Sequence, residues 1–300
     1  MKILGRDVLV GKHEIPADLK QFFEPAECGK CYVCRMVEAF REVRRVLRSD
    51  GTCWVNMGDS YTSGGRKERD LGQSKLHPAF EGDAFVDGLR PDTPAGLKPK
   101  DLVGIPWMLA FALRADGWWL RQDIVWAKPN PMPESVTDRC TRSHEYIFLL
   151  SKSPRYYYDA AAIAEPASDP DLKRFTDGGK DKQRGHERRH EGFNGRYAKK
   201  LREEGVPTTR NKRDVWWVSP YPFPEAHFAT FPPKLIEPCI LAGCPPGGLV
   251  LDPFAGSGTT LMVANSLGRR AVGIELQANY LPMIQRRVES VSSKEVVESP

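Results

Sequence analysis

A glycine-rich turn late in the chain carries the clearest chemical signal. Residues 251–260 read LDPFAGSGTT, an apolar strand-like run that ends in the acid Asp252 and leads into two glycines. Gly256 and Gly258 let the backbone turn tightly and approach a ligand closely. The next apolar segment ends in Glu275, seventeen residues after Gly258. This spacing suits an acid that accepts hydrogen bonds from two ribose hydroxyls.

The pattern of the turn indicates which kind of nucleotide it would take. A dinucleotide turn has the form G-x-G-x-x-G, whose third glycine allows close packing while the helix N-terminus holds a pyrophosphate. Here threonines follow Gly258, and Asp252 would repel a pyrophosphate but can approach an ammonium group. A cofactor with an adenosine and an amino-acid tail but no phosphate fits better, and S-adenosylmethionine is such a molecule.

Two segments resemble a known family. DPFAGSGTT with the downstream GIE resembles the S-adenosylmethionine loop of site-specific DNA amino-methyltransferases, which methylate adenine N6 or cytosine N4. Residues 227–240, HFATFPPKLIEPCI, resemble the family segment that enters a helix before the cofactor strand. Thr230 can cap that helix, and two prolines suit its first turn. The resemblance implies a cofactor shell of Thr230, Phe231, Asp252, Pro253, Phe254, Gly256, Gly258, Thr259 and Glu275, although Phe231 is equally suited to a core position.

The late position of the cofactor segment matches the family order called the β class, in which a catalytic segment and a recognition insert come first. The similarity covers roughly residues 34–164 and 214–288 and includes prophage-type members. It implies an α/β, Rossmann-like methyltransferase fold with this permuted order. We expect a catalytic-side half at 1–166 with a mobile loop at 62–100, a basic target-recognition insert at 167–214, and a cofactor half at 215–300.

The family's catalytic element is a tetrapeptide of Asp, Asn or Ser, then Pro-Pro, then Tyr or Phe. Exocyclic amines are weak nucleophiles, so these groups accept hydrogen bonds from the amine and stack on a flipped base. No such tetrapeptide occurs in the sequence, and the nearest strings are Asp59-Ser60-Tyr61 and Ser219-Pro220-Tyr221-Pro222. Asp59 and Tyr61 are therefore the catalytic candidates, with lining of the cofactor pocket as the stronger expectation for their position.

Three explanations for the missing tetrapeptide stay open. Met1 is an internal start of a longer gene product, which we favour; or the chain is an inactive relative that binds DNA and cofactor; or an atypical residue such as Asp59 does the work. The resemblance implies double-stranded DNA as the partner and allows a cognate restriction nuclease. It leaves adenine N6 or cytosine N4, the recognition sequence and the oligomeric state open.

Several periodic segments would position these residues. Residues 36–47 place Met36, Val37, Phe40, Val43 and Leu47 on one face of an amphipathic helix. The short run TCWVNM predicts a strand, and residues 102–117 predict a helix closed by a glycine. Three further strands are expected, at 118–129, 144–153 and 155–159.

Positive charge is concentrated in one stretch. Residues 173–213 contain fourteen Lys or Arg against six Asp or Glu, a local excess of eight positive charges that suggests a polyanion partner. A solvated basic loop is the alternative. The resemblance places target recognition here, and the candidate DNA contacts are Arg184, Arg188, Arg189, Arg196, Lys199 and Lys200.

The cysteines allow a second kind of site. Cys28, Cys31 and Cys34 have the C-x-x-C spacing of metal ligation, but a second such pair is absent and reduced thiols at a helix start are the stronger expectation. We expect no metal. Seven cysteines without a dense disulfide pattern, and a first segment rich in charge, favour a cytoplasmic protein without a membrane span.

Overall fold

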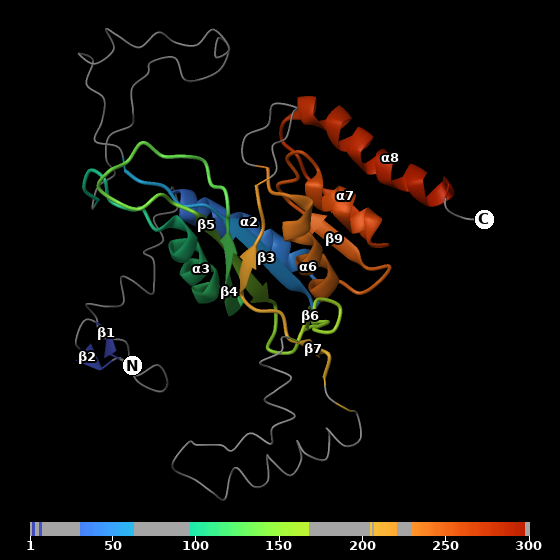
Figure 1. The fold of residues 1–300 in the computed structure, drawn as a ribbon, viewed down its shortest axis with the longest axis horizontal. Coiled ribbons are helices and arrows are strands. Elements are labelled where there is room, and N and C mark those ends of the chain that lie inside the picture. Colours follow the sequence, from blue (N-terminus) through green and yellow to red (C-terminus); the bar gives the residue numbers. More distant parts are fainter. Residues whose placement is uncertain are drawn as a thin grey trace, which may run out of the picture. The chain divides into compact units, whose positions relative to one another are not determined.

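The computed structural model describes residues 2–3, 6–7, 31–62, 97–167, 205, 207–220 and 230–297, with side chains in the last helix up to residue 291. The chain divides into two compact units (Figure 1). The first comprises Met1–Ala127 and Pro131–Tyr156, and the second comprises Lys128–Asn130 and Tyr157–Pro300. Nearly all of the expected mobile loop and most of the basic insert lie outside the described residues.

Three strands form the centre of the first unit: β3 (Thr52–Met57), β4 (Trp119–Ala127) and β5 (His144–Ser151). β5 lies between the other two and is antiparallel to both. Met57 pairs with Tyr146, and Ala127 pairs with His144. The C-terminal ends of β3 and β4 therefore meet the start of β5 at one edge of the sheet, which we call the polar edge. These three predicted strands are confirmed.

The strand predicted at 155–159 is wrong. Residues 156–159 have no regular structure, and polar groups of Tyr156 and Asp159 bond to partners other than a neighbouring strand. The Arg121 guanidinium donates to the Tyr156 hydroxyl at 3.0 Å. Asp159 donates its N–H to the Ala242 carbonyl, and its carboxylate accepts the N–H groups of Ala161 and Ala162. An Asx turn of this kind competes with strand pairing.

Two helices bury the apolar core of the first unit. α2 (Tyr32–Val46) confirms the predicted amphipathic helix, with Val37 and Phe40 buried and Met36 partly buried. α3 (Ile105–Ala115) begins three residues later than expected from Leu102, because Gly104 takes a left-handed conformation (φ 82°) and ends the approach to the helix. The two helices pack with β3 and the buried Trp118 around one core.

The second unit is built on two parallel strands joined by a helix. β9 (Leu249–Asp252) and β10 (Arg270–Gly273) pair in parallel, with Asp252 opposite Gly273. α7 (Thr259–Ser266) connects them and packs with α6 (Pro233–Gly243) around Ile240, Val263 and Ala264. A short 3-10 turn, η3 (Ala278–Tyr280), leads into α8 (Leu281–Val297), which runs alongside α7 (Figure 1).

Short strands complete the described structure. β1 (Lys2–Ile3) pairs with β2 (Arg6–Asp7), and β6 (Glu165–Pro166) pairs with β7 (Thr209–Arg210); β8 is Val215–Trp217. The β6 and β7 pair joins the two ends of the stretch that carries the basic residues, and we call it the stem. Among the described helices, none is long and apolar enough to cross a membrane.

Candidate functional site

The glycine-rich turn forms a loop between β9 and α7. Asp252, at the end of β9, accepts the N–H of Phe254 on its Oδ1 at 3.0 Å. Gly256 (φ 52°) and Gly258 (φ 76°) both adopt left-handed conformations that favour glycine. A Cβ at residue 258 would lie 3.0 Å from Ile284 Cγ2, so the loop backbone lies close against α8. Both glycines singled out in the sequence are thus required by the backbone path.

Glu275 is bound directly to this loop. Its Oε2 accepts the Gly256 N–H at 2.8 Å, and its Oε1 accepts the Gln277 N–H at 2.8 Å. The backbone strengthens the same junction, since Ala255 donates to the Ile274 carbonyl at 2.9 Å. A carboxylate oxygen can accept more than one hydrogen bond. The half-buried Glu275 therefore retains acceptor capacity for hydroxyl groups of a ligand beside the loop.

The other side of the loop is held by a residue that the sequence reasoning missed. Arg287 of α8 donates from Nη1 to the Ser257 carbonyl (2.6 Å), the Ser257 hydroxyl (2.8 Å) and the Thr259 hydroxyl (3.2 Å). Ser257 and Thr259 are buried. The Thr259 side chain, a predicted cofactor contact, therefore has its hydroxyl engaged by Arg287 and Ser257 inside the unit.

The remaining predicted cofactor residues lie around the loop and before α6. The Phe254 side chain is exposed and Pro253 is half-buried. The prediction that Thr230 caps the helix is wrong: Pro232 is the N-cap, and α6 begins at Pro233, whose lack of an N–H costs nothing in a first turn. Thr230 and Phe231 lie just before this start and are half-buried.

Asp59 lies at the polar edge of the first unit and has several partners. Its Oδ1 accepts the N–H groups of Ser60 (2.9 Å), Gly104 (2.9 Å) and Ile105 (3.1 Å), and its side chain is only 4% exposed. The Arg142 guanidinium lies 3.9 Å from Oδ2. Asp59 thus caps the start of α3 from the end of β3. This geometry favours a positioning role, and its catalytic role stays a prediction.

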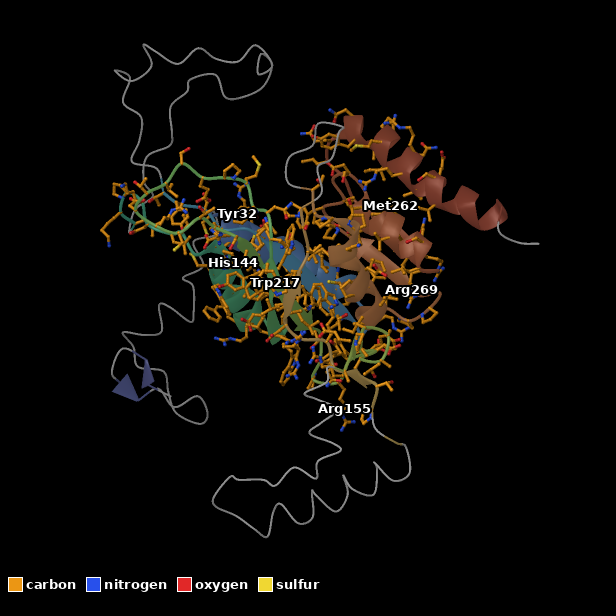
Figure 2. The ribbon with its side chains drawn as sticks, in the orientation of Figure 1. Tyr32, His144, Arg155, Trp217, Met262 and Arg269 are labelled. Atoms are coloured by element: carbon orange, nitrogen blue, oxygen red, sulfur yellow. The ribbon has the colours of Figure 1, made fainter. Side chains whose placement is uncertain are left out.

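Other polar and aromatic groups gather at the polar edge. The Arg139 guanidinium lies 3.9 Å from the centre of the Tyr61 ring, so one face of that catalytic candidate is already covered. His144 packs edge-on against Tyr146, and Tyr32 donates its hydroxyl to Met57 at the end of β3 (Figure 2 labels Tyr32 and His144). The edge therefore presents aromatic rings in edge-on contact beside the Asp59–Arg142 ion pair.

The structure describes two of the three clustered cysteines and none of the six candidate DNA contacts. Cys31 is the N-cap of α2, and its Sγ lies 3.4 Å from that of Cys34. Within the described ranges, no group of three His, Cys, Asp or Glu side chains could hold a metal ion, and Cys28 lies outside them. The six candidate DNA contacts and residues 221–222 also lie outside the described residues.

Known proteins resemble both units. Residues 22–286 match a family described as DNA methylase, of the N6 and N4 type. The Type II methyltransferase M.SmaI of Serratia marcescens is 48% identical over 257 residues, covering 86% of this chain and 74% of the relative. M.Cfr9I of Citrobacter freundii, also a Type II methyltransferase, is 48% identical over 258 residues, 86% of this chain and 71% of the relative.

One solved structure supports the fold. The PvuII DNA methyltransferase, described as cytosine-N4-specific, superposes with a TM-score of 0.52 at 17% identity, covering 90% of this chain and 79% of that chain. At this identity the likeness concerns the fold alone. It confirms the α/β methyltransferase fold expected from the sequence.

Proposed function

Since the chain belongs to the family of N6 and N4 DNA methylases, we propose that its second unit holds S-adenosylmethionine at the loop between β9 and α7. The protein is a DNA methyltransferase that modifies the exocyclic amine of adenine or cytosine. The observation that carries the cofactor site is the 2.8 Å hydrogen bond between the Gly256 N–H and the Glu275 carboxylate, because it joins the turn to an acid with acceptor capacity left.

The residues present fit this cofactor. Glu275 accepts hydrogen bonds from the two ribose hydroxyls, the interaction that acids in this position make in related folds. Asp252 lies at the end of β9 and, with one oxygen bound to the Phe254 N–H, keeps its other oxygen for the ammonium group of the amino-acid tail. Phe254 supplies an exposed ring beside the adenine. When bound, S-adenosylmethionine supplies an electrophilic methyl group on a sulfonium.

Protein groups must make the target amine a better nucleophile. The amine lone pair is delocalised into the base, so an enzyme accepts hydrogen bonds from the amine and orients it toward the methyl group. We propose that the polar edge of the first unit receives the flipped base, with aromatic rings for stacking. Asp59 holds this edge together by capping α3.

The DNA partner agrees with the distribution of charge. The basic stretch supplies cations for phosphates, which fix a protein on the duplex, while the sequence is read at base edges. Relatives named Type II methyltransferases further suggest a cognate restriction nuclease that recognises the same DNA site, and we include this partner in the proposal.

The first test is methyl transfer by the 300-residue chain. The purified protein is incubated with labelled S-adenosylmethionine and mixed-sequence DNA, and modified nucleosides are identified by mass spectrometry. We expect N6-methyladenine or N4-methylcytosine, and loss of cofactor binding in Asp252→Ala. Folded protein that binds no S-adenosylmethionine would refute the cofactor site, and bound cofactor without a methylated base would refute the activity.

A further inference from the structure

Arg287 makes an unusual set of contacts for a helix residue near the end of a chain. A single nitrogen, Nη1, lies within hydrogen-bond distance of three oxygen atoms of the loop, two on Ser257 and one on Thr259, and its two N–H groups are shared among them. The two hydroxyls lie 3.2 Å apart, so they also bond to each other. Hydrogen bonds from a charged donor are stronger than neutral ones. Arg287 therefore fixes the segment between the two left-handed glycines.

Without hydrogen-bond acceptors, a cation at the position of Arg287 would destabilise the fold. α7 begins at Thr259, and its N-terminus carries a partial positive charge that disfavours a nearby cation. Arg287 also lies on the inward side of α8, because Met283 and Ile284, four and three residues earlier, are buried. A cation retained at the start of a helix, among buried side chains, must be stabilised by its acceptors, which include three oxygen atoms of the loop.

The loop is held from two sides by opposite charges. Glu275 accepts the Gly256 N–H on one side, and Arg287 donates to the next residue, Ser257, from α8. Ile284 packs against Gly258, 3.0 Å from the position of a Cβ, and sets the distance between the loop and α8. If Arg287 were removed, Ser257 would lose its charged donor, and the peptide beside Gly256 would gain freedom.

We propose that Arg287 is a positioning residue for the cofactor. It acts through Ser257 and Thr259, which it holds behind the loop so that Gly256 and Glu275 keep the arrangement that accepts the ribose. The same contacts assign Thr259 a supporting role in place of direct contact through its side chain. This inference rests on the proposed function and adds a residue from α8 to the cofactor site.

The test compares Arg287→Met with Arg287→Lys and with Arg286→Met, a matched change at an exposed neighbour on the same helix. Binding of S-adenosylmethionine and of duplex DNA is measured separately for each folded variant by titration calorimetry. We expect the Kd for S-adenosylmethionine to rise about tenfold or more in Arg287→Met, because charged hydrogen bonds are lost. Arg287→Lys should recover part of this loss, and the Kd for DNA should stay within about twofold.

The outcomes separate positioning from general support of the fold. A cofactor Kd in Arg287→Met within about twofold of wild type would overturn the proposal. An equal weakening in Arg286→Met, or an equal loss of DNA binding in Arg287→Met, would also overturn it, since either would indicate a general defect. Failure of the wild-type chain to bind S-adenosylmethionine would instead refute the proposed function on which the inference rests.

Discussion

At the scale of single residues, two charged side chains of the second unit hold the loop between β9 and α7. Glu275 could be anticipated, because an acid seventeen residues beyond Gly258, at the end of the next strand, is a local pattern. Arg287 could not be found in this way, because its contact with Thr259 spans 28 residues and depends on how α8 packs. The available signal was a cation on the apolar face of a helix, three residues after Ile284.

Asp59 shows that a local sequence pattern can suggest chemistry where the structure shows a helix cap. A polar string after a strand suggested chemistry, but the structure gives its carboxylate three backbone donors. Two of these belong to Gly104 and Ile105, 45 and 46 residues later in the chain. No local pattern reveals a helix cap that comes from so far away, and therefore catalytic and structural acids look alike in the sequence.

Replacing the Glu275 carboxylate tests its role directly. In Glu275→Gln an amide NH₂ takes the place of one oxygen, so the N–H of Gly256 or Gln277 loses its acceptor and a ribose hydroxyl loses another. We expect a loss of about 1–3 kcal/mol in S-adenosylmethionine binding, roughly fivefold to 150-fold in Kd. Equilibrium dialysis with labelled cofactor measures it.

The matched control for this change is Glu289→Gln on α8, where an exposed carboxylate accepts a hydrogen bond from Gln285 at 2.8 Å. Its cofactor Kd should equal that of wild type. Equal cofactor affinity in Glu275→Gln and wild type would remove Glu275 from the site.

At the scale of elements, the structure joins the ends of two segments for which the sequence predicted no regular structure, the loop at 62–100 and the basic insert at 167–214. Thr62 donates its N–H to the Asp101 carbonyl at 2.9 Å, and Val103 donates to the Ser60 carbonyl at 2.9 Å. The stem does the same for the basic stretch, where Ala167 donates to the Thr208 carbonyl at 2.9 Å. Helices and most strands could be predicted from periodicity, whereas these closures depend on residues far apart in the chain.

Glu165 forms ion pairs that stabilise the stem. Its carboxylate lies 3.1 Å from Arg213 and 3.6 Å from both Arg210 and Lys212. Burial works against ionisation, but the hydrogen bond from Arg213 and the charges of Lys212 and Arg213 outweigh it, so the pKa of Glu165 lies below its ordinary value. The ionised form is therefore the one that holds the stem.

The lowered pKa of Glu165 predicts how the stability of the fold depends on pH. A carboxyl whose pKa is lower in the folded state stabilises it fully above its unfolded pKa of about 4.3, and the contribution disappears as the pH falls through the lower folded pKa. At pH 7, Glu165→Gln should lower the free energy of unfolding by about 1 kcal/mol. The difference from wild type should vanish in acid. Urea denaturation across this pH range measures it.

Glu237→Gln is the control for the stem, because Glu237 is an exposed carboxylate on α6 of the same unit. Its stability should match wild type throughout. If the free energies of unfolding of Glu165→Gln and wild type differed by the same amount down to strongly acidic pH, the ion pairs would not be the source of the stabilisation.

At the scale of the whole molecule, charge connects the fold to its substrate. The net charge is only +5, but the stretch 173–213 alone holds an excess of eight positive charges, so the rest of the chain carries a small negative excess. Such a distribution directs a polyanion to one segment. Composition revealed this property, because it depends on counts of residues and not on how they pack.

Salt dependence of DNA binding tests which cations contact phosphates. Each phosphate contact contributes about 0.9 to the slope of log K against log salt, so Arg188→Ala with Arg189→Ala should weaken binding and lower the slope by roughly 1.8. The control changes the same charge elsewhere: Arg45→Ala with Arg48→Ala removes two exposed cations of the first unit that already pair with Glu42 and Asp50. Fluorescence anisotropy with labelled duplex between about 50 and 200 mM salt gives both slopes. An unchanged slope in the first variant would place the DNA contacts outside this pair, because counterion release depends only on the phosphates that a protein neutralises. An equal drop in the second variant would show that the effect is not specific to the basic stretch.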